Sequence, residues 1–456
     1  MKLSGWQLLV ASSLILAAFA SAETRPQYGG TLRVALQVAP TSLDPADKTA
    51  ADSISRRNLT WLMFDTLVTI DDAGRVRPGL AATWQSEPGN QRWQFALRHD
   101  VKFHDGIPLT ADMVAASLRF ANPGWTVAAN GDAVVIECKA AAPNLLSELA
   151  LPRNAIAKRT SGSTIAGTGP FHISDWQAGK KLTLTAEEDY WGGRAFLDSI
   201  VVDFGKSSRD QIMALELGKA DFIELAPEQA RRAVVENRRV VNSVPIELLA
   251  LVFAQDRQSV EDGRLREALS LSIDRVSIRS VLLQGQGDLA GGILPVWLGG
   301  YEFVFPSEFN LTRAQQLRGD VQHAPVWTIG YDANDPLARL VAERVALNAR
   351  DSGLRLQPTS SGPSDIRVAR ILFPSTDAWQ ALSHFAAATG MTQPKMTGNS
   401  VEDLYQAESA MLQTQRIVPL LHLPVSYAVS PIVKAFSLDR DGRWQLPDVW
   451  LGKDKP

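Results

Sequence analysis

The chain has 456 residues, of which 45% are hydrophobic and 21% are charged, and its formal net charge at pH 7 is −3. A nearly neutral chain argues against nucleic-acid binding, which relies on a concentrated basic surface. Chains of this length usually divide into more than one domain, each with its own apolar core.

The N-terminus has the pattern of a secretory signal peptide. Lys2 supplies a positive charge, residues 8–20 are apolar, and Ala20-Ser21-Ala22 is a small-residue cleavage site. The apolar run is too short to span a bilayer, which takes about 20 residues. We therefore expect cleavage after Ala22 and a periplasmic protein, with an N-terminal membrane anchor as the alternative. Because no cysteine lies near the cleavage site, we expect no lipid anchor.

The first half of the mature chain is predicted to be rich in strands. Residues 32–36 alternate between apolar and less apolar side chains, as in a strand, and residues 57–67 carry the apolar stripe of a helix. Thr110 is a good N-cap for a helix over residues 110–120. Asn130-Gly131 favours the turn of a β-hairpin over residues 125–139. Further strands are predicted around residues 171–184, 200–204 and 221–223.

The second half alternates between predicted strands and helices. Residues 263–283 have helical spacing, and Asp335-Pro336 begins a helix that should end near Ser352, before Gly353. Another helix is predicted over residues 401–413. Apolar strands are predicted at residues 248–253, 328–331, 371–373 and 417–423. The alternation, without internal repeats, indicates α/β or α+β lobes joined by two chain crossings.

The sequence offers no arrangement of residues typical of catalysis or metal binding. The six histidines are not paired at ligand spacing, and Cys138 is the only cysteine, so no internal disulfide can form. Neither a G-x-S-x-G elbow nor a phosphate-binding loop is present. His104 and Asp105 are of catalytic types, but they lie where a strand turns on a glycine into a helix. An ordered turn is one interpretation of this segment, and an exported hydrolase is the alternative.

Four segments resemble the family 5 extracellular solute-binding proteins of bacterial ABC importers, a family that includes oligopeptide-, dipeptide- and nickel-binding proteins. The order and spacing of the segments match the family as well as their content. The segments are residues 79–84 with 103–112, residues 167–171 with 189–193, residues 214–221, and residues 265–269 with 272–275.

The resemblance implies an α/β fold of the periplasmic binding protein type II, a two-lobed clamshell with an extra subdomain in the first lobe. The first lobe would hold residues 27–248 and 426–456, with the extra subdomain at 46–166. The second lobe would hold residues 249–425. A solute would bind between the lobes and favour their closed arrangement.

Candidate ligand-binding residues follow by analogy with the family. Peptide-binding members often carry Trp-x-x-Asp in a second-lobe loop, but the corresponding stretch here, residues 372–375, has neither residue, and Asp377 and Trp379 lie a few positions on. Arg370 lies where some peptide binders place an arginine for a ligand carboxylate, although a surface arginine is the alternative. The residues expected in the cleft are Lys48, Thr49 and Ala50 in the first lobe and Trp297, Arg370, Phe373, Ser375 and Trp379 in the second.

The predicted function is capture of a small solute, peptide-like or another extended organic molecule, and its delivery to the permease subunits of an ABC importer. We expect a monomer that catalyses no reaction and uses no cofactor. A nickel-chelate or haem binder is an alternative within this fold. A sensing or scaffold protein that kept the fold and lost transport is another, because the chain is shortened between Trp379 and Val401.

Overall fold

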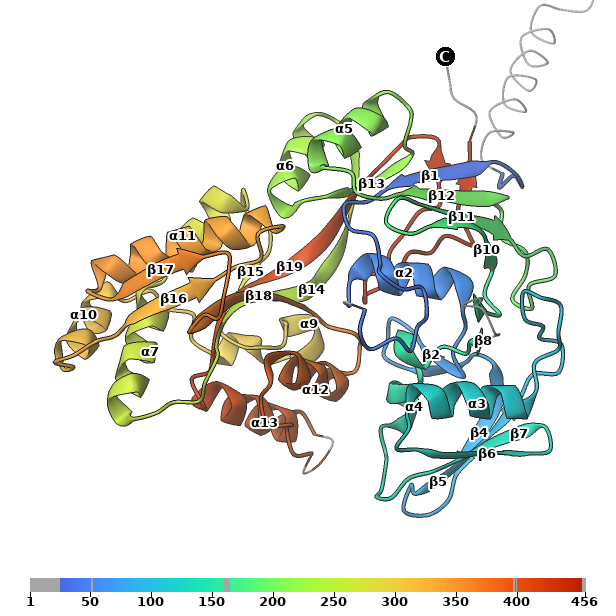
Figure 1. Cartoon of the computed structure of the whole chain (residues 1–456), viewed down its shortest axis with the longest axis horizontal. Helices are drawn as coiled ribbons and strands as arrows, with labels where there is room; N and C mark the ends of the chain where they lie inside the picture. Colours follow the sequence, from blue (N-terminus) through green and yellow to red (C-terminus); the bar gives the residue numbers. More distant parts are fainter. Residues whose placement is uncertain (1–24, 51, 160–164, 397, 399, 453–456) are drawn as a thin grey trace, which may run out of the picture.

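The computed structural model of the protein describes residues 25–50, 52–159, 165–396, 398 and 400–452. Its chain forms two lobes on either side of a pair of long strands (Figure 1). The predicted signal peptide, residues 1–22, and its cleavage site after Ala22 lie outside the described residues. No described helix has both the length and the apolar character needed to cross a membrane.

The first lobe combines part of a large sheet with an extra subdomain. Its main elements are β1 (Thr31–Ala35), α2 (Ile54–Met63), β10 (Phe171–Gln177), β11 (Lys181–Ala186), β12 (Ser199–Asp203), α5 (Ser208–Glu216), β13 (Phe222–Leu225) and α6 (Pro227–Val235). The extra subdomain holds β2 (Val68–Ile70), β3 (Val76–Pro78), β4 (Ala81–Ser86), β5 (Arg92–Leu97), α3 (Ala111–Ala121), β6 (Thr126–Asn130), β7 (Ala133–Glu137), α4 (Leu145–Leu149), η1 (Pro152–Asn154), β8 (Lys158–Arg159) and β9 (Ile165–Ala166).

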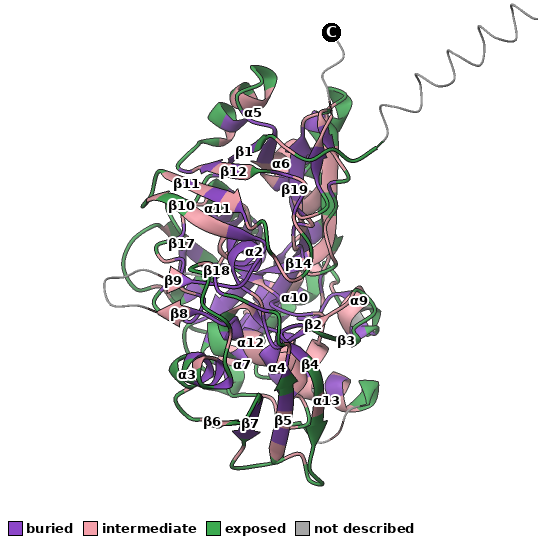
Figure 2. Ribbon diagram, turned by 90° about the vertical axis from the view of Figure 1, so that its right-hand side faces the viewer, coloured by how far each residue is buried: buried purple, intermediate pink, exposed green. Residues whose placement is uncertain are grey.

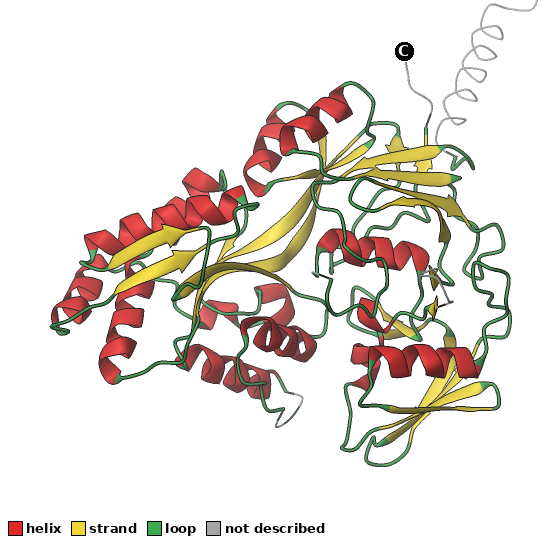
Figure 3. Ribbon diagram, viewed as in Figure 1, coloured by secondary structure: helices red, strands yellow, loops and turns green. Residues whose placement is uncertain are grey.

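The second lobe has helices on both faces of the same sheet (Figure 3). Its elements are α7 (Val260–Ser272), α8 (Arg275–Ser277), η2 (Ile278–Leu282), β15 (Asp288–Leu289), α9 (Val296–Gly299), η3 (Glu302–Val304), α10 (Leu311–Gly319), β16 (Val326–Gly330), α11 (Pro336–Asp351), β17 (Arg355–Thr359), β18 (Ile366–Leu372), α12 (Ala378–Thr389) and α13 (Val401–Gln413). The chain then returns to the first lobe and ends with β20 (Val433–Lys434) and β21 (Trp450–Leu451).

One sheet of eleven strands runs through both lobes, in the order β10-β11-β12-β1-β13-β19-β14-β18-β16-β17, with β15 paired to β19. Strands β14 (Arg239–Phe253) and β19 (Ile417–Val429) connect the lobes as antiparallel neighbours. Their register shifts around the facing pair Pro245 and Pro424. Proline has no N–H to give to the ladder, so the regular pairing is interrupted there. The strands predicted at 248–253 and 417–423 are confirmed, but both extend into the first lobe.

Separate apolar clusters support the lobes. In the first lobe Phe222, Tyr427 and Trp444 pack against one another, and the strand β5 and helix α3 cover a second cluster in the extra subdomain. In the second lobe one cluster joins α7 and α11 to the sheet, and another joins α12 and α13 to it. Figure 2 shows buried residues along the strands of both lobes. The α/β fold with two lobes is therefore confirmed.

Local signals located several elements correctly. Asp335 caps α11, which begins at Pro336, and Gly353 with φ +84° follows its end, as predicted. The hairpin of β6 and β7 turns through Gly131, whose φ is +60°. Two predictions need correction: the helical spacing over 263–283 is broken after Ser272, and α2 begins and ends earlier than residues 57–67. Asp274 caps a new turn there and so divides the predicted helix.

The segment Gly167-Thr168-Gly169 packs directly against the end of α2. A Cβ atom at Gly167 would lie 1.9 Å from the carbonyl oxygen of Met63, and one at Gly169 would lie 2.5 Å from the Met63 carbonyl carbon. Only glycine permits such a close approach between two backbones. This contact fixes the extra subdomain against the helix that carries the cleft residues described next.

Candidate functional site

Two neighbouring cavities lie between the lobes. The first, of about 610 Å³, is bounded by the loop before α2, by α2 itself and by the ends of α3 and α4, and Pro374, His384 and Ala387 face it from the second lobe. The second, of about 630 Å³, is bounded by the carboxyl ends of β16 and β17, by β18 and by the start of α11. Ligands of α/β folds commonly bind at the carboxyl ends of parallel strands. Asp52 and His384 border both cavities.

Arg57 lies at the centre of this region, on α2. Its Nε and Nη2 atoms donate to the two carboxylate oxygens of Asp52, with 2.7 Å between Nε and Oδ1. Its Nη1 atom donates to the carbonyl oxygen of Phe373 in the second lobe, at 2.7 Å. Partial burial would raise the pKa of Asp52, but the charge and hydrogen bonds of Arg57 outweigh it and hold that pKa below its usual range. Asp52 is therefore ionised at neutral pH.

His384, on α12, approaches the same carboxylate from the second lobe. Its Nε2 atom lies 3.6 Å from Oδ2 of Asp52. Burial, followed by the positive charge of Arg57, lowers the pKa of His384 to about 4. The imidazole is therefore neutral at pH 7. The carboxylate of Asp52 is thus contacted from both lobes, by a guanidinium on one side and by a neutral imidazole on the other.

The predicted ligand residue Arg370 borders the second cavity, but its guanidinium already has partners. It donates to both carboxylate oxygens of Glu247 on β14, and its Nη1 atom lies 3.3 Å from Oδ2 of Asp335. Burial would lower the pKa of Arg370, but the charges of Glu247 and Asp335 raise it instead. Glu247 is itself buried. This network joins β14, β18 and the start of α11 into one rigid wall of the cavity.

The loop before α2 contributes the first-lobe residues that the sequence indicated. Lys48 and Ala50 border the first cavity, whereas Thr49 lines neither cleft cavity and donates both its backbone N–H and its hydroxyl to Asp47. Arg56 on α2 fixes the loop by donating to the carbonyl oxygens of Asp44 and Asp47, at 2.7 and 2.9 Å. The position of Lys48 is therefore set by its neighbours.

The other predicted second-lobe residues lie deeper. Phe373 and Trp379 are buried in the cluster under α12, and Phe373 reaches the cleft only through its carbonyl oxygen. The hydroxyl of Ser375 accepts the N–H of Asp377 at 3.0 Å. Trp297 donates from its indole to the carbonyl oxygen of Pro245 at 2.6 Å. Trp297, Phe373, Ser375 and Trp379 line neither of the two cleft cavities. Their role in ligand binding stays a prediction.

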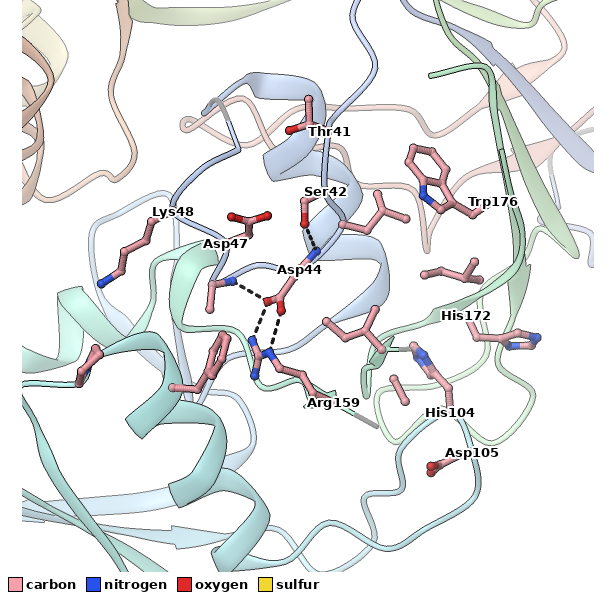
Figure 4. Close-up of a pocket in the computed structure, with 17 residues that line it drawn as sticks. Thr41, Ser42, Asp44, Asp47, Lys48, His104, Asp105, Arg159, His172 and Trp176 are labelled. Atoms are coloured by element: carbon pink, nitrogen blue, oxygen red, sulfur yellow. Dashed lines mark hydrogen bonds and ion pairs between the residues drawn. The ribbon is translucent and has the colours of Figure 1, made fainter. Parts of the chain in front are cut away.

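A larger cavity, of about 1040 Å³, lies inside the first lobe (Figure 4). The ion pair of Asp44 and Arg159 lines it, with 2.6 Å between the carboxylate and guanidinium. His104 also lines it, but the Nδ1 atom accepts the N–H of Gly167 at 3.3 Å and the Nε2 atom lies 3.0 Å from the carbonyl oxygen of Gly169. Burial lowers the pKa of His104 to about 4. His104 therefore orders the glycine segment, as the interpretation of an ordered turn implied.

Sequence reasoning missed Asp52, Arg57 and His384, the residues that the fold brings together in the cleft. Arg57 and Phe373 are 316 positions apart in the chain. No local pattern distinguishes an arginine on a helix that faces a cleft from one that faces solvent. Among the described residues, no group of three or more histidine, cysteine, aspartate or glutamate side chains could hold a metal ion.

Comparison with known proteins gives a family match over most of the chain. The family described as bacterial extracellular solute-binding proteins, family 5 Middle, matches residues 75–391. The nickel-binding protein NikA of Staphylococcus aureus is 28% identical over 237 residues, which are 48% of each protein. The oligopeptide-binding protein AppA of Bacillus subtilis is 25% identical over 58% of this chain and 54% of AppA. The chain thus spans about half the length of these curated relatives.

Solved structures share the whole architecture. The crystal structure of Staphylococcus aureus NikA in complex with Ni(L-His)2 has a TM-score of 0.79 at 19% identity, covering 92% of this chain and 99% of NikA. The periplasmic binding protein DppA of Helicobacter pylori, in complex with the peptide STSA, also has a TM-score of 0.79 at 19% identity, covering 94% of this chain and 99% of DppA. At these identities the likeness shows the fold alone.

Proposed function

The chain belongs to the family 5 bacterial extracellular solute-binding proteins, and from this premise we propose that it captures a small organic solute in the cleft between its lobes and delivers it to an ABC importer. Members of this family bind solutes and are not enzymes. Proteins of this family act outside the cytoplasmic membrane. The predicted signal peptide would export this chain to the same location. The permease subunits of the importer are the proposed partner.

The observation that carries this proposal is that both lobes contribute to the cleft. The first cavity takes its walls from α2, α3 and α4 on one side and from α12 on the other. A solute held there contacts both lobes at once, so it binds more tightly when they are closed. A ligand shifts a conformational equilibrium only through such a difference in affinity.

Both cavities are of moderate size and are lined by apolar as well as polar and charged side chains, and they adjoin at Asp52 and His384. This shape suits an extended molecule with hydrogen-bonding groups, such as a short peptide or a peptide-like compound. The relatives include nickel-, oligopeptide- and dipeptide-binding proteins by name. No group of described residues that could hold a metal ion lies in the cleft, so we favour an organic solute over a bare metal ion.

Native mass spectrometry of the protein, purified gently from a periplasmic extract, tests the proposal. A bound solute stabilises a protein by RT ln(1 + [L]/Kd), about 2.7 kcal/mol at a hundredfold excess over Kd, so a tight solute survives purification. We expect one discrete added mass, or a ladder of peptide masses. The same protein, unfolded in guanidinium chloride and refolded, serves as the solute-free control and should show the bare mass.

A bare mass in both preparations would contradict capture of a solute. The same conclusion would follow if peptides, sugars, amino acids and metal chelates all failed to raise the unfolding temperature of the refolded protein. That combination would instead favour a sensing or scaffold protein that kept the fold and lost transport.

A further inference from the structure

We propose that the guanidinium of Arg57 is a subsite for a carboxylate group of the solute, and that Asp52 occupies this subsite in the present conformation and gives way when the solute binds. The inference rests on the proposed function and names a chemical feature of the solute, a free carboxylate. Its first support is the unequal burial of the two partners. The side chain of Arg57 is 8% exposed, whereas that of Asp52 is 39% exposed and borders both cavities.

A buried guanidinium needs an anion, but it does not need this particular anion. Removing the partner of a buried charge is costly because the charge is left unpaired in a poorly solvated place. Exchange of one carboxylate for another avoids that cost, because the incoming group makes the same two parallel hydrogen bonds. The described contacts of the Asp52 carboxylate are those with Arg57 and His384. No further hydrogen bond or ion pair of this carboxylate is found in the described part of the chain.

The second cleft arginine shows the contrasting case. The carboxylate partner of Arg370 is Glu247, whose side chain is 6% exposed and lies on the long strand β14. Arg370 also contacts Asp335. A solute cannot replace a buried glutamate in the middle of a sheet without breaking the wall of the cavity. Among the described cleft arginines that form ion pairs, only Arg57 therefore combines a buried guanidinium with a carboxylate partner that faces the cleft.

The place of this carboxylate also suits the closure of the lobes. Arg57 on α2 contacts this carboxylate, and the Nη1 atom of Arg57 also donates to the carbonyl oxygen of Phe373 in the second lobe at 2.7 Å. His384 lies 3.6 Å away on α12. A solute carboxylate that takes the position of Asp52 therefore lies beside a side chain of each lobe, Arg57 of the first and His384 of the second. The contact with His384 forms only when the lobes are together, so it adds to the affinity of the closed arrangement.

Acetate tests the subsite directly, without knowledge of the natural solute. The refolded, solute-free Asp52→Ala variant should gain thermal stability as sodium acetate is raised, compared with equal sodium chloride and with acetamide. Asp52→Ala combined with Arg57→Gln should lose this response. Asp71→Ala is the matched control, because Asp71 pairs with the well-exposed Arg75 and Arg77, and it should show no response specific to acetate. Failure of acetate to stabilise Asp52→Ala more than acetamide does would overturn the proposal.

The solute that co-purifies decides whether Asp52 is a competitor or a permanent partner. In native mass spectra of proteins purified side by side, Asp52→Ala should retain solute at least as well as the wild type, and Arg57→Gln should lose it. If both variants lose it together, Asp52 is a permanent partner and the proposal fails. A solute without a carboxylate would also overturn it. If no protein carries a solute, the proposed function fails by itself, and the acetate experiment still decides whether Arg57 accepts an external carboxylate.

Discussion

Ser147, on α4 of the extra subdomain, donates a hydrogen bond of 2.7 Å from its hydroxyl to Oδ2 of Asp377, the residue that caps α12 in the second lobe. The other carboxylate oxygen of Asp377 accepts the N–H of Gln380 at 2.9 Å. The Asp377 carboxylate thus caps helix α12 of the second lobe and also accepts a hydrogen bond from Ser147 of the first lobe. Together with Arg57 and Phe373, this contact joins the lobes on the side of the first cavity.

The Ser147→Ala variant should favour separation of the lobes. A hydrogen bond to a charged group is worth about 1.5 kcal/mol or more, so the ratio of open to closed molecules should rise roughly tenfold. Small-angle X-ray scattering of the solute-free protein should show a larger radius of gyration. Ser174→Ala, which removes an exposed hydroxyl that donates to Thr183 within the first lobe, should leave the scattering unchanged. Identical curves for both variants would show that the contact does not hold the lobes together.

Glu408 should be essential for the stability of the second lobe. It is fully buried, and its carboxylate accepts the N–H groups of Ile293 and Leu294, at 2.5 and 3.0 Å, and the hydroxyl of Tyr301 at 2.8 Å. Glu408→Ala leaves these donors without an acceptor, so the free energy of unfolding should fall by about 3 kcal/mol or more. Urea denaturation measures the change.

Glu402 on the same helix provides the control for this prediction. It is exposed, and its one hydrogen-bond donor among the described residues is the side-chain amide of Gln406. Glu402→Ala should change the free energy of unfolding by less than about 0.5 kcal/mol. Equal effects of the two substitutions would mean that the Glu408 carboxylate does not support the loop before α9.

Gly167→Ala should be strongly destabilising, because its Cβ would lie 1.9 Å from the carbonyl oxygen of Met63. Neither backbone can move without displacing α2, so we expect a loss of at least about 3 kcal/mol in unfolding free energy. Gly124 has open space around its Cβ position and no positive φ, and Gly124→Ala should be close to neutral. Thermal unfolding followed by circular dichroism compares the two, and a stable Gly167→Ala protein would show that the segment and α2 do not meet as closely.

The stability should fall as the pH falls from about 6.5 to 4. Burial lowers the pKa of His104, His384 and His422 to about 4 in the folded protein, whereas an unfolded histidine titrates near 6.5. Between these values the unfolded chain binds more protons, so each histidine removes about 1.4 kcal/mol of stability per pH unit as the pH falls.

Urea denaturation at several pH values in this window tests the histidine contribution. His422→Gln removes one buried titrating group, so its free energy of unfolding should depend less steeply on pH than that of the wild type, even if it is lower throughout. His323→Gln, at an exposed position, should keep the wild-type slope. An unchanged slope for His422→Gln would contradict a neutral, buried His422.

The sequence by itself determined much of the local structure, because caps, turns and apolar periods act between neighbouring residues. Thr110 caps α3, Asp335 and Gly353 bound α11, and residues 401–413 form α13, as predicted. Helix α12 was not predicted, although Asp377 caps it and Gly390 follows it with φ +66°. The resemblance to the family, carried by turns and packing residues such as Gly167 and Gly169, identified the fold.

Only the tertiary structure decided which side chains meet in the cleft. Phe373 and Trp379 have the residue type of a ligand-stacking surface, but the packing of α12 against the sheet buries both. No periodic pattern or motif in the sequence includes Asp52, Arg57 and His384. These residues meet because β14 and β19 connect the two lobes. Contacts between residues hundreds of positions apart depend on how the lobes close. A local pattern in the sequence cannot predict that geometry, because it reports only interactions between neighbouring residues.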